Sequence, residues 1–440
     1  MPLIRLNGTP KQGLAGATLG FFVGFAAVAL FGPMAKKLQT DMGLSPVALG
    51  FAVAAPMLSG SLLRIPFSAW VDTSGGRKPF LMLLSLSTVG MGGLLLFLRS
   101  ATAAEPVRGG YPLLLALGVL CGCGIATFSV GIGQVSYWFP QAEQGFALGT
   151  YAGLGNLAPG IFSFLLPIAL ADWGLGGTYW AWLIFLCLGT LAYALLGRDA
   201  PYFQLRHRGV SDRDARRIAR DHGQQLFPSG SVRDGLVLAA GRWRTWALVS
   251  LYLATFGGFL ALTAWLPVYW SSYFHFTPPI AGILTALFAI TASLARVVGG
   301  FCADRLNGER TALMALGTLV IGSLLMSYSA SFHLSAGAEL LMALGMGVNN
   351  AAVFKMVPKY VPEAVGGASG WVGGLGAAGG FVLPPLMGFI AELRGSTGYA
   401  RCFLLFTVLA LIGLGLAFVL KASPFGDSNI EIEEKKAQVA

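Results

Sequence analysis

Long apolar segments fill this 440-residue sequence and restrict it to one class of fold. Twelve of them are about as long as the roughly 20 residues with which an α-helix crosses the hydrocarbon core of a bilayer. Only 11% of the residues are charged, whereas a soluble domain carries about 25%. The sequence therefore predicts an all-α membrane protein with twelve transmembrane helices. We expect these helices at residues 14–34, 47–70, 79–98, 112–138, 146–170, 178–197, 246–270, 280–303, 312–331, 335–357, 367–391 and 398–420.

The placement of Lys and Arg predicts the orientation of these helices. An even number of spans puts both termini on one side, and 21 of the 29 Lys and Arg residues lie in the loops and tails of that side. Six lie in the opposite loops, and the remaining two lie inside helices. Because cytoplasmic loops of membrane proteins carry the excess of positive charge, we expect both termini in the cytoplasm. The net charge of +10 thus sets topology, and it does not indicate nucleic-acid binding, because no basic cluster is interleaved with aromatic residues.

The longest hydrophilic stretch, residues 198–244, divides the helices into six and six. It holds ten Arg and five Asp, and we interpret it as a cytoplasmic linker with solvated charges and a helix near Ser211–Gln225. The expected units are a first six-helix bundle at residues 1–197, a second at 245–421, and a cytoplasmic tail at 422–440.

Several classes of function find no support in the sequence. The five cysteines all lie within apolar segments, which favours small packing residues over disulfides or metal ligands. No nucleophile–base set and no metal-ligand cluster lies at a helix end, so we expect no enzyme, no metal and no cofactor. A sensor would need a large folded signalling domain, and the 47-residue linker and the short tail are too small for one.

The two halves of the chain repeat one another. Arg64 and Arg296 are 232 positions apart, and Asp72 and Asp304, which follow them, are separated by the same interval. Repeats of this kind place equivalent residues at equivalent depths in two related bundles. Arg64 and Arg296 are therefore expected to be symmetry mates, each displaced from mid-membrane toward the cytoplasmic side.

These two arginines are the most informative residues in the chain. A charge at the bilayer centre costs about 2.5–3.5 kcal/mol on insertion scales, so two of them require a reason. One alternative is that they reach toward the headgroups, and another is a structural ion pair. The helices supply almost no carboxylate for such a pair, since only Glu339 lies within one, near its outer end. Two positive charges without a protein counter-ion favour a site for an anionic substrate.

Two parallel six-helix halves joined by a basic loop resemble the major facilitator superfamily. The loop at residues 68–78, Ser-Ala-Trp-Val-Asp-Thr-Ser-Gly-Gly-Arg-Lys, resembles the signature of that family, with Ser68 in place of its leading Gly and one residue inserted. Asp72, Arg77, Asp304 and Arg305 could together form an intracellular latch that breaks as the halves rock. The alternative is that these charges only set the topology.

Glycine-rich segments extend the resemblance to a narrower family. The tripeptide Gly-Leu-Gly occurs at residues 153–155 and again at 374–376, in corresponding helices. Beside two buried arginines, these segments resemble the paired signatures of the nitrate/nitrite porter family, the NarK-type transporters. The likeness continues at 136–140, 251–257 and 350–355, and Ala152 is a departure, since that position is often Gly in the family.

The resemblance implies a role for particular residues. Arg64 and Arg296 would grip the anion, Phe128 would flank it, and Tyr252, Phe256 and Phe25 would surround it. The helix asparagines of the family match Asn156 and Asn350, and the glycines that let helices slide match Gly153, Gly155, Gly374 and Gly376. It also implies a monomer in a bacterial cytoplasmic (inner) membrane, and transport by alternating access.

The expected substrate is nitrate, nitrite or both. Nitrate is planar with three equivalent oxygens, which two guanidinium forks can hold, whereas a phosphate ester would call for additional Lys or His at that depth. A carrier of another anion, such as an organic phosphate or carboxylate, is the nearest alternative. The sequence is compatible with two modes of transport, nitrate/nitrite antiport and nitrate/proton symport. Glu339 and Lys355, both near helix ends, are the only candidates for a proton relay.

Overall fold

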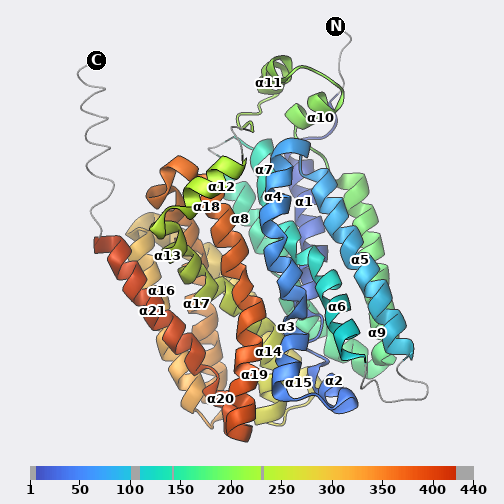
Figure 1. Cartoon of the computed structure of the whole chain (residues 1–440), viewed down its shortest axis with the longest axis vertical. Coiled ribbons are helices and arrows are strands. Elements are labelled where there is room, and N and C mark those ends of the chain that lie inside the picture. Colours follow the sequence, from blue (N-terminus) through green and yellow to red (C-terminus); the bar gives the residue numbers. More distant parts are fainter. Residues whose placement is uncertain (1–5, 101–109, 141–142, 229–231, 423–440) are drawn as a thin grey trace.

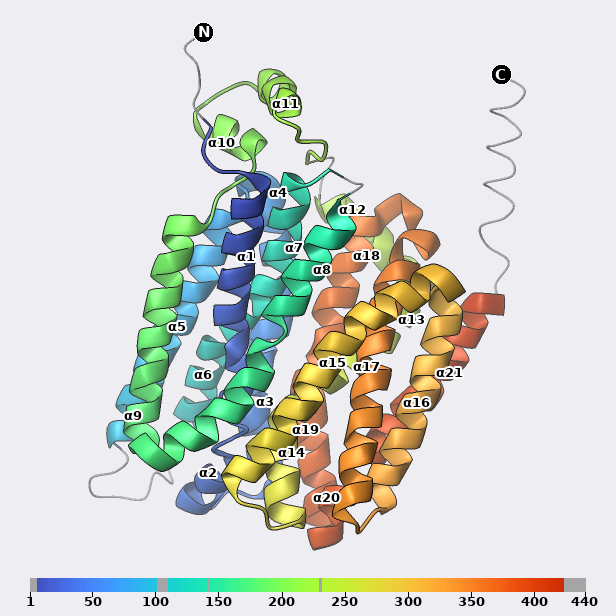
Figure 2. The same ribbon diagram turned by 180° about the vertical axis from the view of Figure 1, so that it is seen from behind.

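Helices make up nearly all of the computed structural model, which describes residues 6–100, 110–140, 143–228 and 232–422. Eleven runs of helix in these ranges are long and apolar enough to cross a membrane. One of them, Ala147–Leu196, has 50 residues, and a straight helix of that length would measure about 75 Å, against a hydrocarbon core of about 30 Å. The run contains Gly174 with φ 64° and ψ −177°, a non-helical conformation at which two helices meet in a kink. Figure 2 shows this part of the chain turning back on itself. It therefore forms two spans, and the predicted total of twelve is confirmed for the described residues.

The spans of the first half contain α1 (Pro10–Phe25), η1 (Ala26–Ala29), α3 (Pro46–Leu62), α4 (Arg64–Ser74), α5 (Arg77–Ser100), α6 (Tyr111–Cys121), η2 (Gly122–Ala126), α7 (Thr127–Trp138), α8 (Gln144–Gly155) and α9 (Ala158–Leu196). The spans of the second half contain α13 (Trp243–Tyr252), η3 (Leu253–Gly257), α14 (Gly258–Tyr273), α15 (Pro278–Leu306), α16 (Gly308–Tyr328), α17 (Phe332–Tyr360), α18 (Val365–Leu375), η5 (Gly376–Ala378), α19 (Gly379–Arg394) and α21 (Leu404–Ala422). Short helices between spans are α2 (Ala35–Met42), η4 (Pro362–Ala364), η6 (Gly395–Thr397) and α20 (Gly398–Arg401).

Figure 1 shows the two halves side by side, blue to green on one flank and yellow to red on the other. The start of α1 and the end of α21 lie at the same end of the molecule, together with the helices of the linker. We call this end the linker side. The opposite end, which carries α2 and α20, is called the far side.

Two predicted span ends were wrong. The first span ends at Ala29 instead of residue 34, because the Gly32-Pro33 sequence that follows turns the chain, and proline cannot continue the helical hydrogen bonds. The last begins at Leu404 instead of residue 398, since Gly398–Arg401 forms a separate short helix. Most of the predicted tail, residues 423–440, lies outside the described residues.

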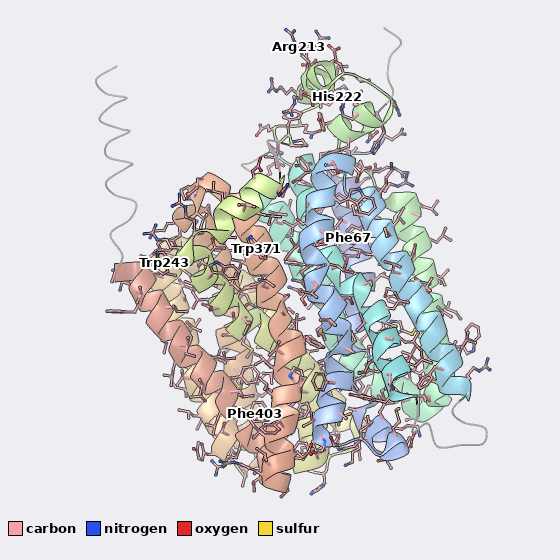
Figure 3. All side chains as sticks on the ribbon, viewed as in Figure 1. Phe67, Arg213, His222, Trp243, Trp371 and Phe403 are labelled. Carbon is pink, nitrogen blue, oxygen red and sulfur yellow. The ribbon has the colours of Figure 1, made fainter. Side chains whose placement is uncertain are left out.

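The linker contains three short helices, α10 (Pro201–His207), α11 (Asp212–Asp221) and α12 (Val232–Ala240). The helix predicted to end at Gln225 ends at Asp221, because Gly223 adopts φ 84°. Figure 3 shows α11, with Arg213, standing clear of the bundles, whereas α12 lies against α18. There the indole N–H of Trp371 donates to the carbonyl of Leu236 at 2.9 Å, which ties the linker to the second half.

Irregular turns interrupt five of the spans, and a sixth irregular turn, η1, ends the first span. The five interruptions are the break at Leu63, η2, the break at Asn156–Leu157, the π-helical turn η3, and η5. Helices α15 and α17 run on without such a turn. Irregular backbone at membrane depth is tolerated only where protein buries it or where it lines a cavity, and π turns are frequent at functional sites. The interruptions therefore indicate where the functional centre lies.

Candidate functional site

Arg64 begins α4, directly after the break at Leu63, and its side chain is almost wholly buried, with 1% exposed. Nε donates to the carbonyl of Gly60 one turn earlier at 3.0 Å, and Nη1 donates to the carbonyl of Gly373 in the second half at 3.1 Å. Nη2 is buried without a hydrogen-bond partner. Two contacts thus fix the guanidinium, and one face of its fork is left to bind something else. This burial excludes the alternative in which Arg64 reaches the headgroups.

Arg296 lies on the uninterrupted helix α15 and meets the same two rings as Arg64. Its guanidinium carbon is 5.6 Å from the centroid of Phe128 and 5.7 Å from that of Phe256. The corresponding distances from Arg64 are 4.8 and 5.0 Å. Nη1 of Arg296 is likewise buried without a partner. The fold therefore brings together the two arginines that the 232-residue repeat had paired.

No ion pair among the described residues involves either arginine. The partners of Arg64 are backbone carbonyls and aromatic faces, which are attractive but carry no net negative charge. A buried charge that lacks a counter-ion is costly, so two adjacent guanidinium groups strongly favour an anion between them. The site therefore has the electrostatics of an anion-binding site.

Four aromatic rings line the pair. Phe128 comes from the first half, and its ring stacks on Phe256 of the second half at 5.9 Å. Tyr252 stacks on Phe256 at 4.8 Å with an interplanar angle of 12°, and Phe354 meets Tyr252 edge-on at 5.1 Å. Phe354 also lies 5.9 Å from the guanidinium of Arg296, and sequence reasoning gave it no role. Its position four residues, or one helical turn, after Asn350 was the signal that could have identified it.

Phe25 lies one layer behind these rings. It packs on Phe21 with centroids 4.8 Å apart, and Phe21 in turn packs on Phe128 at 5.3 Å. Phe21 also stacks on Tyr151, whose hydroxyl donates to the carbonyls of Thr127 and Phe128. Phe25 therefore supports the ring that faces the arginines, and Phe21 and Tyr151 are supporting residues that the sequence did not reveal.

The two predicted asparagines are both buried, each with 3% exposed, and each has an Oδ1 atom without a hydrogen-bond partner. The backbone carbonyl of Asn156 accepts from Ser293 at 3.1 Å, one turn before Arg296 on α15. Next to Asn350, Asn349 donates to Thr255 at 3.0 Å, beside Phe256. An amide can present its NH2 group in place of its oxygen by turning over, so both side chains could donate to an anion.

Three of the four predicted glycines lie where a side chain would collide. A Cβ atom on Gly376 would lie 2.7 Å from the Tyr252 ring, and one on Gly374 would lie 2.7 Å from Ile65. A Cβ atom on Gly155 would overlap the ring of Phe21. Gly153, in contrast, has no heavy atom within 4 Å of that position. The first three hold rings and backbones close together in this conformation, and Gly153 leaves space open.

The four residues of the predicted latch each contact other residues in this conformation. Asp72 accepts from the hydroxyl of Tyr137 at 2.6 Å, and Arg77 donates to the carbonyl of Ala194 at 2.6 Å. Asp304 pairs with Lys355 at 2.5 Å. The guanidinium of Arg305 lies over the ring of Phe301, 4.2 Å from its centroid. In this conformation each charge of the latch therefore has a partner within its own half.

The two halves are in backbone contact on the far side. A Cβ atom on Gly50 would lie 2.5 Å from the carbonyl oxygen of Pro384, and one on Gly388 would lie 2.8 Å from the carbonyl carbon of Pro46. Beside Gly153 of α8, in contrast, no heavy atom lies within 4 Å of the Cβ position. The structure thus has a closed far side.

Comparison with known proteins identifies the family. The sequence model of the Major Facilitator Superfamily matches residues 17–337 and 269–440. A probable nitrate/nitrite antiporter of Thermus thermophilus, NarK1, is 32% identical over 407 residues, covering 86% of this chain and 85% of the relative. The chain belongs to the nitrate/nitrite porter family. A nitrite extrusion protein of Bacillus subtilis is 28% identical, and the alignment covers 90% of this chain and 90% of that relative. A probable nitrate transporter of Staphylococcus epidermidis, NarT, is 27% identical, and the alignment covers 90% of this chain and 93% of that relative.

Solved structures show that this porter has the fold of the superfamily. A partially occluded inward-open structure of the xylose transporter XylE from E. coli gives a TM-score of 0.69 at 14% identity, covering 95% of this chain and all of that one. The human organic anion transporter MFSD10 gives 0.62 at 18% identity, covering 93% and 100%. At these identities the likeness concerns the fold alone. The nitrate/nitrite porter described here is therefore a multi-pass membrane protein of the major facilitator fold.

Proposed function

We propose that this protein moves nitrate, nitrite or both across a bacterial cytoplasmic membrane by alternating access. The observation that carries the proposal is the pair Arg64 and Arg296, which share the rings of Phe128 and Phe256, lack a carboxylate partner and each keep a free buried N–H group. The relatives named as a probable nitrate/nitrite antiporter and as a nitrite extrusion protein support nitrate and nitrite as the anions.

The chemistry of the site suits a small, flat anion. The free donors of the two guanidinium groups can each bond an oxygen of nitrate, and the rings of Phe128 and Phe256 cover its weakly hydrated faces. Asn156 and Asn350 would contribute donors, Tyr252 would fix the ring of Phe256, and Phe25 would support Phe128 from behind. Binding offsets the repulsion between the arginines, which permits the halves to close around the anion.

Alternating access requires an orientation and moving parts. The linker side would face the cytoplasm, because it carries most of the Lys and Arg residues. The bundles 1–197 and 245–421 would rock about the site, with the far side closed in the present conformation. Gly153, Gly155, Gly374 and Gly376 would let the helices slide, and Asp72, Arg77, Asp304 and Arg305 would exchange partners as the linker side closes. We expect a monomer, since each chain holds a complete site.

Exchange in proteoliposomes tests this function. We expect labelled nitrate to enter vesicles loaded with nitrate or nitrite, and to stay outside vesicles loaded with sulfate or glycerol phosphate. Preferential exchange of an organic phosphate or a carboxylate would instead establish the alternative substrate. Steady chemical conversion of the anion would show that the protein is an enzyme and contradict the proposal.

A further inference from the structure

Glu339 is a buried acid that the anion site does not use. Two glutamates of the described chain are almost wholly buried, Glu309 with 2% and Glu339 with 3% exposed. Glu309 is paired with Lys359 at 2.7 Å and also accepts from Tyr360. Glu339 has no cationic partner. Its Oε2 accepts from the indole N–H of Trp270 at 3.1 Å, and its Oε1 has no partner.

Among the described residues, no cation is paired with Glu339. Tyr269 of α14 lies close enough to Glu339 to interact with it electrostatically, and Tyr273 and Cys402 lie around Tyr269. On the adjacent α16, Tyr328 is the nearest titratable residue, and the guanidinium of Arg401 lies over its ring at 4.0 Å. The neighbouring part of α15, residues 278–295, has no titratable residue. On α17 itself, His333 lies exposed near the helix start, and the lysines lie at the opposite end.

An ionised carboxylate in this position is costly, because a single hydrogen bond replaces its hydration and no cation among the described residues is paired with it. A protonated carboxyl group satisfies the site better, since one oxygen still accepts from Trp270 and the charge is gone. The closed far side, which excludes water, therefore favours the neutral form of Glu339. The ionised form is favoured when water enters this region.

Glu339 also connects the far-side closure with the arginine site. Its partner Trp270 lies on α14, in the same span as Phe256. A Cβ atom on Gly32 of the first half would lie 2.9 Å from the carbonyl oxygen of Ala264 on that helix. Helix α17 in turn packs on α15 at Gly347, where a Cβ atom would lie 2.7 Å from Ala295, the neighbour of Arg296. Contacts between helices thus link the surroundings of Glu339 both to the first half and to the helix that carries Arg296.

We propose that Glu339 is a proton-binding site, and that the far side closes only when the carboxylate has taken up a proton from the water on that side. The step is an acid–base equilibrium in which the proton adds to a carboxylate oxygen and leaves it again when the site is rehydrated. The inference rests on the proposed nitrate transport, because the proton controls the cycle that moves the anion.

The test is tracer exchange of nitrate between the two sides of proteoliposomes, measured at equal internal and external pH. Nitrate remains ionised throughout, and equal pH makes the vesicle orientation irrelevant. For the unmodified protein we expect exchange to fall by up to about tenfold per pH unit above its midpoint, as a single titrating group requires. Glu339→Gln, which keeps an acceptor for Trp270 and is permanently neutral, should exchange nitrate rapidly at every pH.

Two further variants make the test specific. Glu392→Gln changes an exposed acid on the same side and should keep the original pH profile. Trp270→Phe removes the donor that stabilises the ionised carboxylate, so as a single substitution it should move the midpoint of the pH profile to higher pH. In the double variant with Glu339→Gln it should have no such effect. A profile of Glu339→Gln that matches the unmodified protein, or an unmodified protein without pH dependence, would overturn the inference. Absence of nitrate exchange at every pH would instead contradict the proposed function.

Discussion

The guanidinium of Arg64 in the first half donates from Nη1 to the backbone carbonyl of Gly373 in the second half, at 3.1 Å. The bond joins the two bundles at the level of the anion site, and it lies in the glycine-rich helix α18. Because a guanidinium has five N–H donors in a fixed fork, Arg64 can hold this carbonyl and still present Nη2 to an anion. The residue that binds the substrate is therefore also a contact that holds the halves together.

Replacing Arg64 by Lys should nearly abolish nitrate exchange. An ammonium group cannot reach Gly60, Gly373 and an anion in the geometry of the fork. Loss of one charge-assisted hydrogen bond costs about 1.5–3 kcal/mol, which corresponds to at least a tenfold loss of exchange. The measurement is nitrate exchange in proteoliposomes, with Arg394→Lys on the exposed far side as the matched control. Normal exchange by Arg64→Lys would show that the site is assigned wrongly.

Replacing Phe128 by Leu should weaken nitrate binding without unfolding the protein. The substitution removes the ring face from both guanidinium groups, and each cation–π contact is worth about 0.5–2 kcal/mol. The concentration of nitrate that gives half-maximal exchange should therefore rise several-fold, while the maximal rate falls less. Phe51→Leu, at a ring that is 40% exposed, is the control and should leave both quantities unchanged. An unchanged half-maximal concentration in Phe128→Leu would place the anion away from this ring.

The arginine pair could be predicted from the sequence because a charge within an apolar helix is rare and its repeat at a fixed interval is visible along the chain. The hydrogen bond between Arg64 and Gly373 could not be predicted. Every residue has a backbone carbonyl, and no side chain indicates which carbonyl accepts from the guanidinium. The hydrogen bond between Trp270 and Glu339 was beyond the sequence for a related reason. The sequence places Glu339 near the outer end of its helix, but it does not show which side chain of another helix packs against it.

The pattern of spans was predictable to within a few residues, but their interruptions were not. Apolar length predicts that a segment crosses the membrane, whereas the π turn Leu253–Gly257 depends on contact with another helix. There, a Cβ atom on Gly257 would lie 2.8 Å from Gly379 of the glycine-rich span, so close packing of two backbones shapes the turn. The partners of Asp72 and Asp304 were also beyond the sequence, because Tyr137 and Lys355 lie 65 and 51 residues away along the chain and only the packing of the helices brings them close.

Alanine substitutions at two glycines should separate packing from movement. Gly376→Ala places a methyl group 2.7 Å from the Tyr252 ring, and overpacking of this kind costs about 1–3 kcal/mol, so both the melting temperature and nitrate binding should fall. Gly153→Ala meets no atom within 4 Å and should melt at the same or a higher temperature, because Ala favours a helix by up to about 1 kcal/mol.

Gly153→Ala should nevertheless slow nitrate exchange, since the open space beside it must close when the linker side closes. Gly92→Ala is the control, because it also has open space around it but lies on α5, away from the site. Melting is measured by intrinsic fluorescence in detergent, and exchange in proteoliposomes. Full-rate exchange by Gly153→Ala would show that α8 does not move through this space.

Asp199, in the loop after the sixth span, should make the stability of the protein depend on pH. Only 8% of the surface of Asp199 is exposed. Its Oδ1 accepts a hydrogen bond from the backbone N–H of Arg77, at the start of α5, at 2.8 Å. Burial raises the pKa of the Asp199 carboxyl above its ordinary value, against the opposing effects of that N–H and of the charges on His207 and Arg77. Because the folded pKa lies above the unfolded one, the stabilisation is complete below the unfolded pKa of about 3.9 and is lost as the pH rises through the folded pKa.

Asp199→Asn keeps an acceptor for Arg77 but removes the charge that is costly at neutral pH. It should therefore melt at a higher temperature than the unmodified protein at neutral pH, and the difference should shrink as the pH is lowered toward about 4. Asp199→Ala loses the acceptor at the helix start and should be less stable by about 0.5–2 kcal/mol. The measurement is the melting temperature in detergent across this pH range. If Asp199→Asn lowers the melting temperature at neutral pH as much as Asp199→Ala does, the charge of Asp199 stabilises the fold and the predicted sign is wrong.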